Sequence, residues 1–245
     1  MPSSLVIDRR ITFRGDALYR ANIRDLFQEE KRHDSDRFTG IALDTTNRWA
    51  VSVPGTSDTI AISEVVGGSA LITTGTADND SCMLAGAIIH NGTKLSVVEF
   101  RITITDVTGC GVFVGLSDAK SEANGQIALQ YPSDTFTSTA TSAAGFVIDA
   151  DHSTSSFMCA SVNAGSDTTP VDTGVDWVDG ETRNLRILVD TSGNAIFVID
   201  GKVVAQIQSA VAAGTLHCPT VQAITRANDG SNTIRVHSFD SWQDD

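Results

Sequence analysis

The stretch 182–207, TRNLRILVDTSGNAIFVIDGKVVAQI, decides the fold of this chain. It places Leu185, Ile187 and Val189 at alternate positions, the period of two that is typical of a half-buried strand. A second apolar run ends in Asp200-Gly201, and a third run follows. An Asp-Gly pair between apolar runs favours a two-residue hairpin, because both turn positions need positive φ. The stretch therefore predicts three consecutive antiparallel strands.

The rest of the body repeats this kind of pattern. Short apolar runs alternate with turn clusters at roughly ten-residue intervals, which is typical of a sandwich or barrel. No helical pattern separates the runs and no repeat of fixed period is present, so the sequence disfavours parallel α/β, propeller and solenoid folds. The predicted strands outside the first stretch are 49–53, 59–66, 69–74, 82–89, 95–105, 111–116, 126–131, 145–149, 156–162, 219–226 and 232–242. Two polar segments, 133–144 and 163–176, are expected to be exposed loops.

The N-terminal segment differs from the body in charge. The whole chain has a net charge of −13, but residues 1–40 hold eight Lys/Arg against seven Asp/Glu, and the remainder holds nine against twenty-three. Such an asymmetry indicates a separate role for the first segment. We expect an N-terminal arm over residues 1–37 and one β-domain over residues 38–245.

The arm contains the only convincing amphipathic helix of the chain, at about residues 16–32. Its apolar residues recur at i, i+4, i+7 and i+8, one face of a helix, and Asp16 is available as the N-cap. This face can pack on its own domain or dock on another subunit, and the sequence leaves both open. The candidate contact residues are three arginines of an extended first part and the four apolar helix residues: Arg9, Arg10, Arg14, Tyr19, Ile23, Leu26 and Phe27.

Composition excludes several classes of protein. The acidic net charge argues against a general affinity for nucleic acid or anionic membranes. No run approaches the roughly 20 apolar residues of a membrane helix, and the start lacks the apolar core of a secretory signal. The four cysteines form no CxxC pair and no histidine has zinc-ligand spacing, so buried thiols are expected, with three disulfide pairings left open.

Five segments, in this order and spacing, resemble the concanavalin A-like lectin/glucanase superfamily over about residues 40–245. They are 95–105 (LSVVEFRITIT), 111–118 (GVFVGLSD), 185–190 (LRILVD), 197–202 (FVIDGK) and 234–240 (IRVHSFD). The resemblance implies an all-β fold, a two-sheet antiparallel jelly-roll sandwich, here with an N-terminal arm and one short helix. A fold of this kind does not by itself fix a function.

No catalytic set is legible in the sequence. The family's glucanases carry an ExDxxE strand whose three carboxylates share one face, as alternation along a strand requires. None of the six glutamates begins this pattern: Glu99 lies on a predicted strand, but Arg101 and Thr103 stand where its acidic partners would be. We therefore expect a protein that is not an enzyme and that needs no cofactor.

Three weaker patterns could belong to a functional site, but for each of them we prefer a purely structural interpretation. Asp149-Ala-Asp151-His152 could line a site but also reads as the polar end of a strand. Asp78-Asn79-Asp80 could offer oxygen ligands to Ca²⁺ but also reads as an Asx-rich turn. Trp49, Trp177 and Trp242 could stack on sugars, but core packing is favoured; Trp177, between acidic turns, is the candidate glycan contact.

The combination of a jelly roll without glycosidase residues and a short N-terminal arm resembles head decoration or minor capsid proteins of tailed bacteriophages. This resemblance implies a structural protein of a virion that is made in the host cytoplasm and not secreted. It would dock by its arm on the major capsid protein or another virion subunit and form a homo-oligomer. The alternative is a carbohydrate-binding, lectin-like module, free or on a virion that contacts host glycans.

Overall fold

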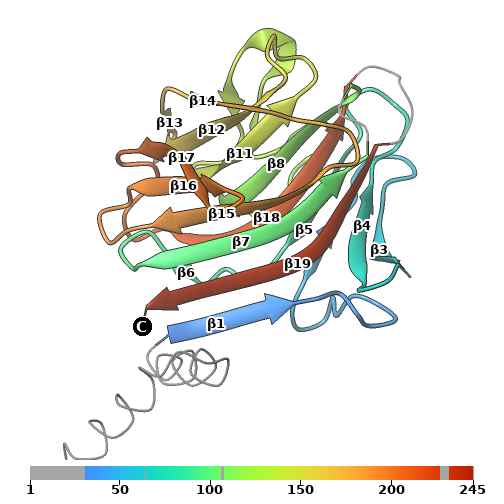
Figure 1. Cartoon of the computed structure of the whole chain (residues 1–245), viewed down its shortest axis with the longest axis horizontal. Helices are drawn as coiled ribbons and strands as arrows, with labels where there is room; N and C mark the ends of the chain where they lie inside the picture. Colours follow the sequence, from blue (N-terminus) through green and yellow to red (C-terminus); the bar gives the residue numbers. More distant parts are fainter. Residues whose placement is uncertain (1–30, 64, 106–107, 227–231, 245) are drawn as a thin grey trace, which may run out of the picture.

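The computed structural model describes residues 31–63, 65–105, 108–226 and 232–244, and these form two antiparallel sheets that pack face to face (Figure 1). Within these ranges the first sheet has eight strands. In spatial order, with the strand that pairs only with β19 placed last, they are β17 (Lys202–Ile207), β16 (Ala195–Ile199), β15 (Thr182–Val189), β7 (Ser96–Ile104), β19 (Thr233–Asp244), β4 (Ser69–Thr73), β3 (Thr59–Ser63) and β1 (Lys31–Asp36).

The second sheet has nine strands in the same described ranges. Along its path they are β13 (Ser166–Asp167), β12 (Ser156–Asn163), β11 (Ala143–Asp149), β8 (Cys110–Ser117), β18 (Leu216–Thr225), β5 (Ser81–Ala85) and β2 (Ala50–Ser52), with β14 (Val171–Asp176) beside β12 and β6 (His90–Asn91) beside β18. The predicted all-β, two-sheet antiparallel jelly-roll sandwich is thus confirmed for the described residues. No helix among them is long and apolar enough to cross a membrane.

The predicted meander is present as β15, β16 and β17. Leu185, Ile187 and Val189 are buried, and the strands pair in order, β15 with β16 and β16 with β17. Asp200 and Gly201 join the last two strands with φ of 48° and 81°, the positive values that the Asp-Gly pair predicts. β15 also pairs with β7, so the meander forms one end of the first sheet.

One strand lies where the sequence predicts the arm. Lys31–Asp36 forms β1, which pairs antiparallel with the end of β19 along all six residues. Ion pairs hold this edge: Arg48 contacts Asp34 and Asp36, and the indole Nε1 of Trp49 donates to Asp36 at 2.8 Å. β1 has no apolar alternation, since its side chains are charged or polar, so a search for hydrophobic periodicity passes over it. The seven candidate contact residues of the arm lie outside the described residues.

The main core fills the space between the two sheets. Aromatic side chains form its centre next to β19, where the rings of Trp49 and Phe100 each lie with their centroid 5.2 Å from that of Phe239. Phe146 meets Phe197 edge to face at 5.4 Å, which links the two sheets across the sandwich. Such interdigitated packing from two inner faces is the usual core of a β-sandwich.

A second apolar cluster lies outside the sandwich, on the far face of the second sheet. Residues 126–140 cross this face and bury Ile127, Leu129 and Tyr131 against Phe113. Every residue of β8 and β11 is therefore buried, whereas a sheet with one face in water shows alternation.

This covering segment differs from the prediction. Only two residues of the expected strand 126–131 are a strand, β9 (Leu129–Gln130), and they pair with β10 (Thr137–Ser138) apart from both sheets. A single 3-10 turn, η1 (Pro132–Asp134), joins them. The expected loop 163–176 also contains two strands, β13 and β14, which extend the edge of the second sheet.

Candidate functional site

The covering segment is hydrogen-bonded to the outer face of the second sheet. The side-chain oxygen of Gln222 on β18 accepts a hydrogen bond from the amide of Ala128, and its amide nitrogen donates to the Met83 sulfur at 3.1 Å. Gln222 is fully buried. A buried amide with both ends satisfied locks the segment over the sheet, because breaking either bond would leave a polar group without a partner.

A buried ion pair holds the same segment a few residues further along, at Gln130 and Tyr131. Arg226 and Asp149 join through Nη2 and Oδ2 at 2.6 Å and through Nε and Oδ1 at 2.9 Å, with side chains 4% and 0% exposed. Arg226 also donates to the side chains of Gln130 and Asn79, and Asp149 accepts from the amide of Tyr131. Asp149 is thus a structural anchor at the end of β11. This agrees with the interpretation of Asp149-Ala-Asp151-His152 as the polar end of a strand.

The acidic turn at 78–80 is likewise engaged by its own chain. Asp80 accepts from the amide of Ala77 and from the side chain of Asn124, both at 3.3 Å. Burial raises the pKa of the neighbouring Asp58, although amides of Gly55 and Gly75 donate to it and oppose this rise. No group of three His, Cys, Asp or Glu in the described ranges has the arrangement of a metal site.

Glu99, the one glutamate weighed as catalytic, is held by an ion pair. Its carboxylate accepts from Nε of Arg186 on the adjacent strand β15 at 2.5 Å. Glu99 and Arg186 are direct cross-strand partners, which places both on the outer face of the first sheet. Opposite charges directly across a strand pair stabilise the sheet, so this contact explains Glu99 without chemistry.

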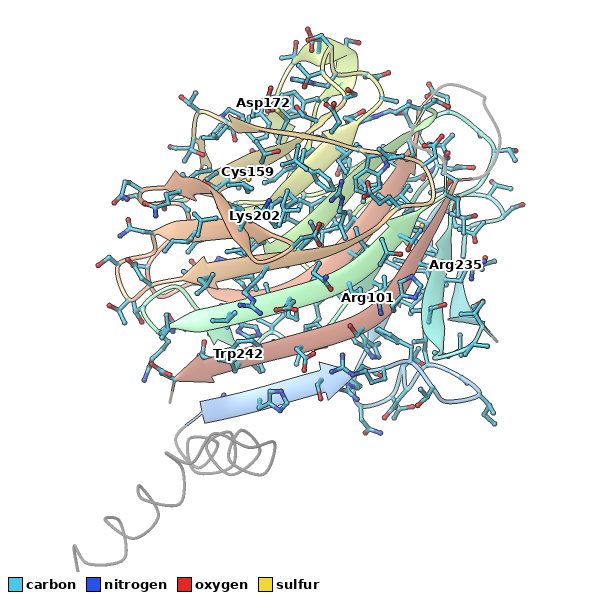
Figure 2. All side chains as sticks on the ribbon, viewed as in Figure 1. Arg101, Cys159, Asp172, Lys202, Arg235 and Trp242 are labelled. Atoms are coloured by element: carbon cyan, nitrogen blue, oxygen red, sulfur yellow. The ribbon has the colours of Figure 1, made fainter. Side chains whose placement is uncertain are left out.

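The tryptophans divide into two buried and one half-buried. Trp177, the candidate glycan contact, is only 6% exposed and packs edge to face on Phe157 with centroids 4.6 Å apart. Its position fits the core alternative and leaves no ring face for a sugar. Trp49 is also in the core, whereas Trp242 is half-buried on the outer face of β19, 6.5 Å from the ring of His33 (Figure 2).

A Ser–His pair lies at the start of β18, near the end of the sandwich where β6 pairs. Ser142 Oγ and His217 Nε2 are 2.7 Å apart, the spacing of a nucleophile and its base. Both residues are about 1% exposed, and Ser142 Oγ also accepts from the amide of Ala212, so a substrate has no access to the hydroxyl. The pair is therefore a satisfied polar contact within the structure.

His90 is the cross-strand neighbour of His217 and is also buried. Neither ring nitrogen of His90 has a hydrogen-bond partner. Burial and the nearby His217 lower the pKa of His90 to about 4, and burial lowers the pKa of His217 as well. Both imidazoles are neutral at pH 7.

All four cysteines are buried free thiols, the first of the two states that the sequence leaves open. Burial raises the pKa of the Cys82, Cys159 and Cys218 thiols. For Cys218 the pKa is raised to about 12. Cys218 Sγ contacts the carbonyl oxygens of Ser117 and Ala119 at 3.3 and 3.1 Å. Thiols that are protonated and inaccessible behave as small apolar side chains.

An open depression at the end of the sandwich has the shape of a ligand site. It holds about 450 Å³, where β1 begins and β19 ends. Its described lining comes from four separate segments: Arg32, Ile89, Asn91, Lys94, Leu216, Gln243 and Asp244. The depression is not predictable from the sequence, because no motif or spacing connects residues that only the fold brings together.

Solved structures share this fold at low sequence identity. The carbohydrate recognition domain of Emp47p is 13% identical with a TM-score of 0.57, over 87% of this chain and 95% of that one. An uncharacterized protein from Mycobacterium paratuberculosis is 12% identical with a TM-score of 0.59, over 85% and 99%. A sialidase is 13% identical with a TM-score of 0.57 over 85% of this chain, which spans only 18% of that protein. No family model and no curated protein matches the sequence. The chain therefore has the concanavalin A-like jelly-roll fold, and the likeness extends no further than the fold.

Proposed function

We propose that this chain is a non-enzymatic structural protein of a viral particle, a capsid decoration protein that attaches by its N-terminal segment and displays the sandwich. The observation that carries the proposal is the way this segment joins the domain. β1 follows residue 30 directly and pairs with β19 over six residues, beside ion pairs of Arg37 and Arg48. Because β1 is hydrogen-bonded to β19, a contact made by residues 1–30 is connected directly to the first sheet.

The distribution of charge supports different roles for the two parts of the chain, attachment for the N-terminal segment and display for the body. The net charge of −13 resides in the body, while the first 40 residues are close to neutral and carry three early arginines. An acidic body stays soluble at high density and repels neighbouring bodies, which suits many copies on one surface. Attachment by a short segment at many lattice positions also gains avidity that a single contact lacks.

The chemistry of the described residues fits a role without catalysis. Asp149 is bound to Arg226, Glu99 is bound to Arg186, and the hydroxyl of Ser142 is inaccessible. Glycosidase chemistry needs two carboxylates about 5 to 10 Å apart that face a sugar-binding cleft. The acids described above are engaged in ion pairs or turns instead.

The test is binding of purified protein to capsids that lack this chain, measured by co-sedimentation. The deletion should end at residue 30, since removal of 31–36 would also remove β1. We expect Δ1–30 to keep the β-rich circular dichroism spectrum and to lose capsid binding. The full chain with Ile23→Asp and Phe27→Asp should lose binding as well, because charge on the predicted apolar face opposes burial. Binding by both variants at the level of the unchanged chain would contradict the proposal.

A second candidate function is carbohydrate binding. The observation that favours it is the open depression between β1, β6, β18 and β19, together with a fold shared with the carbohydrate recognition domain of Emp47p. The two functions are compatible, since a displayed domain can also contact a glycan. A glycan array probed with the full chain separates them from a purely structural role.

A further inference from the structure

The strand β3, with the sequence TIAIS, forms one end of the first sheet, opposite β17 (Figure 1). Among the described edge strands of at least five residues, it alone has no charged side chain: β1 and β17 carry lysine, and β14 carries two aspartates. Charges on an edge strand keep other strands from pairing with it. β3 lacks this protection along its whole length.

The backbone of β3 is open on its outer side as far as the described residues show. All five of its residues pair with β4 on the inner side. Apart from β4, the one described group that is bonded to this backbone is the amide of Val65, which donates to the carbonyl of Ser63 in the turn that follows. The edge therefore presents amide and carbonyl groups to which a further antiparallel strand can bond.

Two rows of apolar side chains run across the inner face of the first sheet and end at β3. Cross-strand pairing sets the members of the first row side by side: Ile104, Ile234, Ile72 and Ile60. It does the same for the second row: Ile102, Val236, Ala70 and Ile62. The members on β7, β19 and β4 are fully buried, whereas the two isoleucines of β3 are only half-buried against the main core. The core is thus incomplete at this edge.

We propose that β3 pairs with β3 of a second copy of this chain, antiparallel and about a two-fold axis at Ala61. In this register Ile60 of each copy lies opposite Ile62 of the other, so both apolar rows continue into the second copy and four isoleucines become more deeply buried. Such a two-fold contact uses the same patch on both copies. Because β3 itself is uncharged, it is a place where two chains with a net charge of −13 can approach.

The proposed contact lies away from the N-terminal segment. β4, which joins β3 to the sheet, pairs with Thr233–Val236 at the start of β19, whereas Lys31 pairs with Asp244 at its end. The stretch of strand from Val236 to Asp244 spans roughly 25 Å. The pairing of two copies therefore does not rest on the proposed attachment to a capsid.

Ala61 provides a symmetric test, because the proposed axis sets this residue directly opposite its own copy. Its side chain alternates with the isoleucines, is exposed, and lies on the outer face of the sheet. Ala61→Lys should raise the Kd of the dimer at least about tenfold, since two like charges would then lie about 5 Å apart, and Ala61→Glu should do the same. An equimolar mixture of the two variants should dimerise again, because opposite charges would then face each other.

Sedimentation velocity of the full chain over a dilution series measures these equilibria. Gln206→Lys is the matched control, since it adds the same charge at an exposed position of β17, the other end of the sheet. It should leave the Kd unchanged, and equal circular dichroism spectra should show that all variants are folded. An unchanged chain that is monomeric at every concentration would overturn the proposal, as would a dimer that Ala61→Lys does not weaken. A mixture that stays monomeric would also overturn it, because the two-fold register requires the rescue.

Discussion

At the scale of single residues, the Arg226–Asp149 pair is the contact with the largest expected effect on stability. Both side chains are almost fully buried, and Arg226 also contacts Gln130 and Asn79. A buried pair contributes little net stability compared with apolar residues, but loss of one partner leaves an uncompensated charge. The importance of the pair therefore lies in holding the covering segment to β11 and β18.

Arg226→Met should lower the free energy of unfolding by about 3 to 5 kcal/mol, because the Asp149 carboxylate would remain buried without its cation. Urea titration followed by tryptophan fluorescence measures this change. Arg183→Met is the control: Arg183 pairs with Glu181 and Asp200 at the surface and should cost at most about 1 kcal/mol. Equal losses in the two variants would show that the buried pair is not the anchor described above.

The neutral buried histidines predict a loss of stability in acid. His90 has a folded pKa of about 4, below the ordinary histidine value of 6.5, so the unfolded chain binds its proton first as the pH falls. Stability from this residue is fully present above about pH 6.5 and is lost as the pH falls toward 4, by about 3 kcal/mol in total. Burial also lowers the pKa of His217, although the charge of Asp118 acts against this shift. Protonation of His217 therefore adds to the loss of stability in acid.

The measurement is the urea midpoint between pH 7 and pH 4 for the unchanged chain and for His90→Leu. Leu has no proton to bind and no ring nitrogen to leave unpaired, so the variant should show a flatter dependence on pH. A variant with the same slope as the unchanged chain would assign the acid sensitivity to other groups.

At the scale of elements, local pattern explains what could be predicted. The meander was predictable because alternation and the Asp-Gly turn lie within one short stretch, and the structure confirms both. β1 was not predictable, because its charged and polar residues show no apolar period. It forms a strand by pairing with β19, which is distant in the sequence. β14 is also an edge strand, but it does alternate: Val171 and Val175 pack against the core while Asp172 and Asp176 are exposed, and the sequence predicts a loop here because only two of its six residues are apolar.

The covering segment shows a second limit of sequence patterns. Residues 126–131 have the β-rich composition of a strand, but they cover a sheet instead of joining one. Periodicity reports that a segment is apolar on one side and does not report which surface it meets. The depression is the extreme case, since its lining spans residues 32 to 244 and exists only after β1 and β19 pair.

The Asp200-Gly201 turn provides a direct test of an element. Gly201 has a φ of 81°, which glycine adopts freely and residues with a branched Cβ avoid. Gly201→Val should lower the thermal midpoint, with a cost of about 1 to 2 kcal/mol. Gly201→Asn should cost clearly less, because asparagine tolerates positive φ. Calorimetry of the two variants distinguishes backbone strain at this turn from a general effect of adding a side chain, which would lower both midpoints equally.

At the scale of the whole molecule, the two sheets pack face to face, a segment of the chain covers part of the second sheet, and β1 pairs with β19 along its whole length. One face of the second sheet is filled by the chain itself, and the other faces the core. The depression beside β1 is open to solvent. The proposed attachment does not use it and is made by residues 1–30.

The central claim, attachment to a capsid by residues 1–30, is tested most directly by cryo-electron microscopy of the purified particle. The account predicts density for the sandwich at regularly repeated positions on the outer surface, with contact to the shell made by residues 1–30 next to β1. Particles without this density, or a shell contact made by the sandwich while residues 1–30 point away from the shell, would contradict the account.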